Sequence, residues 1–128
     1  MRRGGRDPAV SARIDNWEQA VAFALSLPET ELSTSYGKPA VKLVSNGRPF
    51  LYTGHEAANS FGVAVDLDTI EMLKETDPDT FWQTPHYEGW PAVLIRFGSA
   101  DPERVRAIVE RARDWTAAKP KVKPRKKK

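Results

Sequence analysis

The stretch KPAVKLVSNGRPFLYTG, residues 38–54, decides how the middle of this chain folds. Two runs rich in apolar and β-forming residues flank the dipeptide Asn46-Gly47. Asparagine and glycine accept the positive φ angles that tight hairpin turns require. The dipeptide between two such runs therefore predicts a β-hairpin.

Further strands are expected on both sides of this hairpin. Upstream, larger side chains alternate with polar ones at Leu32, Thr34 and Tyr36. Downstream, the stretch SFGVAVD, residues 60–66, carries an apolar side chain at every second position. A period of two is typical of strands, so we expect four antiparallel strands in succession.

Helical signals precede these strands and return after them. Asp15 with Glu18, and Asp68 with Glu71, have the spacing of a capping box at the start of a helix. An apolar stripe with helical spacing follows the first pair, and Pro28 ends that helix. We expect four aromatic side chains on or beside such stripes to lie in the core: Trp17, Phe23, Phe61 and Trp115.

Two Asp-Pro pairs mark the remaining helices. Asp77-Pro78 predicts a short helical turn through residues 81–82, and Asp101-Pro102 predicts the last helix. Between them, AVLIRF, residues 92–97, is apolar enough for a central strand. The predicted order is α-β-β-β-β-α-α-β-α. We therefore expect a single α+β domain, an antiparallel sheet of about five strands with helices packed largely on one face.

Charge is unevenly distributed along the chain. The net charge is +3 and the pI is about 9.3, but residues 8–118 hold ten Lys and Arg against sixteen Asp and Glu. The excess of cations therefore belongs to the two ends of the chain. We predict a basic disordered arm at residues 1–10, a folded domain at 11–117, and a Lys/Pro-rich disordered tail at 118–128.

Several function classes are not supported by the sequence. The chain has no cysteine, which excludes disulfides and thiol nucleophiles. It has no phosphate-binding loop, no G-x-S-x-G motif and no convincing cluster of metal ligands. No signal peptide or membrane span is visible. We expect a non-enzymatic cytoplasmic protein without cofactor or metal, and a monomer is favoured.

The stretch TPHYEGWP, residues 84–91, is the densest in chemically distinctive side chains. Pro85 and Pro91 restrict the residues before them, which favours a stiff connection with Tyr87 and Trp90 folded onto the sheet. The alternative is a surface platform on which bases or a ligand stack, with His86 beside it. Both interpretations remain open at this point.

Two segments resemble the MmcQ/YjbR-like family. These are ALSLPETELSTSYGKPAVK, residues 24–42, and ETDPDTFWQTPHYEGWPAVLIRF, residues 75–97. The resemblance spans about residues 17–116. It implies a compact α+β fold and a DNA-binding role with a double-wing arrangement, and it brings no established reaction or cofactor. The wings would be the Asn46-Gly47 hairpin and the 54–60 loop.

These considerations give a predicted function and an alternative. The predicted function is weak DNA binding that is largely independent of sequence, with the basic ends of the chain supplying most of the electrostatics. The candidate contacts are Lys38, Arg48, His86, Tyr87, Lys119, Lys121, Lys123, Arg125, Lys126, Lys127 and Lys128. The alternative is a binding module for a small ligand or a protein partner, with a cleft near Tyr36, His86, Tyr87 and Trp90.

Overall fold

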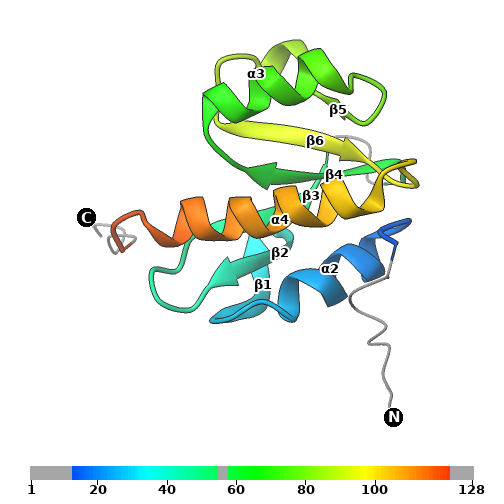
Figure 1. Ribbon diagram of the computed structural model, residues 1–128. Helices are drawn as coiled ribbons and strands as arrows, with labels where there is room; N and C mark the ends of the chain where they lie inside the picture. Colours follow the sequence, from blue (N-terminus) through cyan, green and yellow to red (C-terminus); the bar gives the residue numbers. More distant parts are fainter. Residues whose placement is uncertain (1–12, 55–57, 122–128) are drawn as a thin grey trace.

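The computed structural model describes residues 13–54 and 58–121 (Figure 1). The predicted N-terminal arm, part of the 54–60 loop, and Lys123, Arg125 and Lys126 to Lys128 lie outside these residues. The described helices are α2 (Trp17–Leu25), α3 (Leu67–Thr76), the 3-10 turn η1 (Pro85–Tyr87) and α4 (Pro102–Ala117). The strands are β1 (Thr30–Ser35), β2 (Lys38–Leu43), β3 (Pro49–Thr53), β4 (Ser60–Ala64), β5 (Phe81–Trp82) and β6 (Ala92–Arg96).

All six strands form one antiparallel sheet in the order β1-β2-β3-β4-β6-β5. The predicted α+β class and the run of four consecutive strands are confirmed. The short helix predicted through residues 81–82 is wrong, because these residues form β5 and pair with Ile95 and Leu94 of β6. The sheet therefore has one strand more than the five expected.

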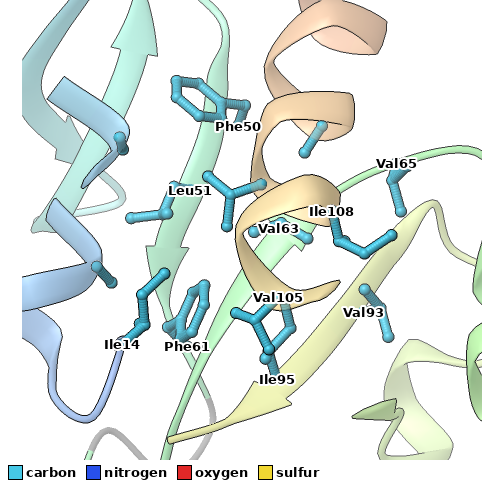
Figure 2. Packing of buried hydrophobic residues seen from close by; sticks show 14 of the residues in the cluster. Ile14, Phe50, Leu51, Phe61, Val63, Val65, Val93, Ile95, Val105 and Ile108 are labelled. Carbon is cyan, nitrogen blue, oxygen red and sulfur yellow. The ribbon is translucent and has the colours of Figure 1, made fainter. Parts of the chain in front are cut away.

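The core lies between the sheet and the helices. Figure 1 shows α2 and α4 crossing the same face of the sheet, and α3 lies by β5 and β6. Leu51, Val63 and Val93 are cross-strand partners and are fully buried, and Figure 2 shows Val105 and Ile108 of α4 packed above this layer. Burial of these apolar side chains, each stabilising by about 1.5–3 kcal/mol, holds the helices on this face. None of the described helices has the length and apolar character that a membrane crossing requires.

Two predicted helix starts are shifted by one or two residues. Asn16, not Asp15, caps α2, since its Oδ1 accepts a hydrogen bond from the backbone N–H of Gln19 at 2.8 Å. Asp66, not Asp68, caps α3 through Thr69. In both cases the Asx residue directly before the helix reaches the free N–H groups of the first turn and takes the cap. The predicted cap at Asp101 is confirmed.

The predicted hairpin between β2 and β3 is present, and its turn is fastened to the end of α4. Asn46 is only 4% exposed. Its Nδ2 donates to the carbonyl oxygens of Thr116 at 2.8 Å and Lys119 at 3.1 Å, and its Oδ1 accepts from the Arg48 N–H at 3.0 Å. The Asn46 side chain of the proposed first wing thus faces the protein and not solvent.

Candidate functional site

The strand register sets which side chains point away from the helices. Successive strand residues face opposite sides of a sheet, so Tyr52, Gly62 and Leu94 face away from the layer that contains Leu51. The Tyr52 ring lies directly over Gly62, because a Cβ at position 62 would be 2.5 Å from Tyr52 Cε1. A large ring can occupy this place only because its neighbour has no side chain.

The stretch 84–91 connects β5 to β6 and is fixed by Gln83. The Nε2 atom of Gln83 lies within hydrogen-bond distance of the carbonyl oxygens of Tyr87 (3.1 Å), Trp90 (3.2 Å) and Ala92 (2.8 Å). The Tyr87 N–H donates to Thr84 O at 2.9 Å, and the Trp90 N–H donates to Tyr87 O at 2.9 Å. These bonds satisfy backbone carbonyl and N–H groups in a segment with little regular structure. The backbone therefore has the hydrogen bonding expected of a stiff connection.

The side chains of this connection do not pack fully onto the sheet. Tyr87 is half-buried, whereas His86 is exposed and Trp90 is 64% exposed. The His86 and Tyr87 ring centroids are 5.9 Å apart. The stretch therefore combines the two interpretations offered by the sequence, with a fastened backbone that presents rings to solvent.

A cavity of about 540 Å³ opens beside this connection. Its wall is formed by segments that are distant in sequence: the β1–β2 turn, β3, the ends of β4 and β6, η1, and the C-terminal turn of α4. Five aromatic side chains line it, namely Tyr36, Tyr52, Tyr87, Trp90 and Trp115. Lys38, Arg48, Lys119 and His86 line it too, and no carboxylate does so among the described residues.

The three permanent cations of this cavity have no acidic partner in the described part of the chain. Arg48 Nε donates to the Pro120 carbonyl oxygen at 2.7 Å, a neutral acceptor. Lys119 Nζ lies 3.8 Å from the centroid of the Trp115 ring, in a cation–π contact. Ion pairs are formed by cations elsewhere, among them Arg13, Lys74, Arg111 and Arg113. Positive charge is therefore left uncompensated at the cavity, on a body whose net charge is negative.

Two hydroxyl groups of the cavity wall are unusual. Thr116 is 2% exposed, and its Oγ1 has no hydrogen-bond partner among the described residues. Burial, reinforced by the nearby Tyr87, raises the pKa of Tyr52 well above its ordinary value. Tyr52 therefore stays a neutral phenol at physiological pH and adds no negative charge beside the three cations.

Comparison with known proteins assigns the chain to a family. A family model described as YjbR matches residues 25–115. The chain belongs to the YjbR family. Searches of the curated proteins and of the solved structures gave no match. In this YjbR protein the matched range contains the cavity residues from Tyr36 to Trp115, whereas Thr116 and Lys119 lie just beyond it.

Most candidates predicted from the sequence meet at this one cavity of the YjbR fold. The residues brought together are Tyr36, Lys38, Arg48, His86, Tyr87, Trp90 and Lys119. Lys121 is described and exposed but is not part of the wall. Lys119 and Pro120, placed at the start of the predicted tail, contact the folded domain.

Several cavity residues were not predicted as site residues, among them Tyr52, Trp115 and Thr116. Trp115 was expected in the core, which is wrong, because it is half-buried and lines the cavity. A spacing of four residues continues the buried stripe of α4 from Ala112 to Thr116. This spacing was available in the sequence and leaves Trp115 at the border of the stripe.

The described residues contain no group of three or more His, Asp or Glu side chains arranged to hold a metal ion. His86 makes no hydrogen bond to another titratable group in this part of the chain, although it lines the cavity. What the arrangement can do chemically is bind: its cations suit anionic groups, and its rings suit planar ones.

Proposed function

We propose that this YjbR protein binds nucleic acid with little sequence preference, through the cavity and the basic residues that follow it. One observation carries the proposal. Three Lys and Arg side chains without acidic partners in the described part of the chain and five aromatic rings converge on one cavity of an otherwise acidic domain.

Physical chemistry links this arrangement to a phosphate-bearing ligand. Lys and Arg neutralise phosphates and release their counterions, which gives affinity without reading sequence. Aromatic side chains add stacking that tolerates any base. The acidic remainder of residues 8–118 repels a polyanion, which restricts contact to the face that carries the cavity.

The C-terminal basic run begins at the same face. Lys119 lines the cavity and Arg48 binds the Pro120 carbonyl, so the chain leaves the domain beside the cavity. The residues that follow include Lys123, Arg125 and Lys126 to Lys128. In this proposal they supply much of the electrostatic attraction, and the cavity supplies orientation.

We propose binding without catalysis. Support comes from His86, which has no hydrogen bond to a second titratable group in the described residues that could tune it as an acid or base. A nucleic-acid ligand is also compatible with the cytoplasmic location proposed from the sequence. A second candidate function, a small-ligand module, is favoured by the concave form of the site, because small ligands occupy such cavities.

The test is DNA binding across a salt series with two chain lengths. The shortened chain should end at Lys121, because removal of Lys119 or Pro120 would also disturb Trp115 and Arg48. We expect the full chain to bind and the shortened chain to bind more weakly. The log–log salt slope should decrease by about 0.9 for each duplex phosphate that the shortened chain no longer neutralises.

A matched pair of substitutions tests the cavity itself in the shortened chain. Lys38→Gln removes a cavity cation that makes no ion pair with the described residues, and Arg13→Gln removes one charge outside the cavity. We expect Lys38→Gln to weaken binding more than Arg13→Gln. Equal effects of the two substitutions, or no binding by the shortened chain at low salt, would contradict a site in the domain.

A further inference from the structure

We infer that the cavity accepts one unpaired nucleotide unit, meaning a planar base together with its phosphate. The unit can come from a single strand or from a free mononucleotide. This inference rests on the proposed function and names the chemistry that the same site would select. It sets single-stranded ligands apart from duplex DNA.

The size of the cavity supports a single unit. About 540 Å³ lies within the range of roughly 300–1,000 Å³ found for sites that enclose a small molecule. A duplex keeps its bases stacked inside and offers only groove edges and phosphates. The aromatic wall can therefore engage a base only when that base is unpaired.

Two exposed rings at the cavity support stacking. Tyr36 is fully exposed, and its φ angle of 54° lies in the left-handed region that tyrosine rarely adopts. Trp90 is 64% exposed and belongs to the segment fastened by Gln83. Large rings held in water on fixed backbone lose little conformational freedom when a flat ligand covers them.

The cations are placed for a phosphate of the same unit. Lys38 comes two residues after Tyr36. Lys119 contacts Trp115 in the last turn of α4, and Arg48 binds the carbonyl of Pro120, which follows that helix. Arg48 donates only from Nε to Pro120 O in the described part of the chain, and a guanidinium has four further N–H donors on its two terminal nitrogens. Such a guanidinium suits a phosphate with two oxygens available.

The unpartnered Thr116 hydroxyl supplies a separate observation. A buried polar atom without a partner calls for an explanation. Thr116 Oγ1 has no hydrogen-bond partner among the described residues, and Thr116 belongs to the part of α4 that lines the cavity. Because Thr116 is 2% exposed, a ligand meets its hydroxyl only after a small shift of the cavity wall, and the ring nitrogens, carbonyl or amino groups and sugar oxygens of a nucleotide would then complete it. An aliphatic ligand would leave it unsatisfied.

The experiment compares three probes on the full chain at one salt concentration. The probes are a single strand of oligo-dT with about ten nucleotides, a duplex of about ten base pairs, and AMP as a competitor against the single strand. Tryptophan fluorescence is a suitable readout because Trp90 and Trp115 line the cavity. We expect the single strand to bind at least about tenfold more tightly than the duplex.

Three substitutions localise the effect. Trp90→Ala should lower single-strand affinity about tenfold, the size expected when one base no longer stacks on an aromatic ring, and should leave duplex affinity unchanged. Thr116→Val keeps the side-chain shape and should lower single-strand affinity while the fold persists. Leu32→Ala, an exposed apolar truncation outside the cavity, should change neither affinity.

The outcomes separate this inference from the proposed function. Displacement of the single strand by AMP would show that the free unit suffices, and a single strand that AMP does not displace would assign the site to strands alone. Equal affinity for single strand and duplex, with no effect of Trp90→Ala, would overturn the inference and leave non-specific nucleic-acid binding intact. No binding of any probe would overturn both.

Discussion

The clamp between the β2–β3 hairpin and α4 should be one of the largest single-residue contributions to stability outside the apolar core. Asn46 makes three hydrogen bonds from a buried position, two as donor and one as acceptor. A typical intramolecular hydrogen bond contributes about 0.5–1.5 kcal/mol net, and an orphaned buried partner adds to the loss. We therefore expect Asn46→Ala to lower the free energy of unfolding by about 2–4 kcal/mol.

The assay is urea denaturation followed by circular dichroism, with a thermal melt alongside. A loss of about 3 kcal/mol corresponds to a fall in Tm of about 10 °C for a chain of this size. Asn46→Asp should lose at least as much, because a carboxylate oxygen would replace the donor that faces two carbonyl oxygens. An unchanged m-value would show that the unfolded state is the same.

Ser45→Ala is the matched control, since Ser45 is exposed and lies in the same turn. Exposed substitutions of this kind usually change stability by less than about 0.5 kcal/mol. If Asn46→Ala also lost less than about 1 kcal/mol, the hydrogen bonds to Thr116 and Lys119 would not hold the hairpin, and the clamp would be refuted.

Three further predictions concern the sheet and its connections. Gly62→Ala should destabilise the protein by about 1–3 kcal/mol in thermal melts, because the added methyl group overlaps the Tyr52 ring; an unchanged Tm would contradict this packing. Gln83→Ala should weaken binding of the oligo-dT strand clearly while it changes Tm little, because the β5–β6 connection loses the hydrogen bonds that fasten it; affinities and melts of the same samples test this, and an unchanged affinity would contradict it. Burial raises the pKa of Asp66, but hydrogen bonds from Thr69, together with the charge of Arg111, outweigh this effect and hold the pKa below its ordinary value. The resulting stability is present above the unfolded-state pKa of about 3.9 and is lost as the pH falls through the folded-state pKa. Asp66→Asn should therefore flatten this part of an acid-denaturation profile, and an unaltered profile would count against the assignment.

Local chemistry accounts for the part of the fold that the sequence predicts. Asn46-Gly47 and Asp101-Pro102 act within a few residues of themselves, so the hairpin and the last helix could be located without tertiary information. The strand β5 could not be located this way. It has two residues, too few to show alternation, and it exists because Phe81 and Trp82 pair with β6.

The cavity residues also divide into those that can be named from the local sequence and those that depend on tertiary contacts. Its candidate residues could be named from the sequence because exposed rings and cations beside Gly and Pro are locally visible, as at Tyr36 and Lys38. Their meeting depends on pairing across the sheet and on the Asn46 clamp, which joins residues 70 positions apart. Tyr52 was missed because its role depends on Gly62 in the next strand, a relation that only the register reveals.

The contact between Arg48 and Pro120 also limits how far the cations that follow Lys121 can be from the cavity. The chain continues for seven residues beyond Lys121, and covalent geometry limits seven residues to a span of about 25 Å. Five further cations therefore stay within that distance of the last described residue, whatever the protein concentration. Under the proposed function, a ligand that touches the cavity would engage these cations in an intramolecular event, and the two contributions would reinforce one another beyond their separate affinities.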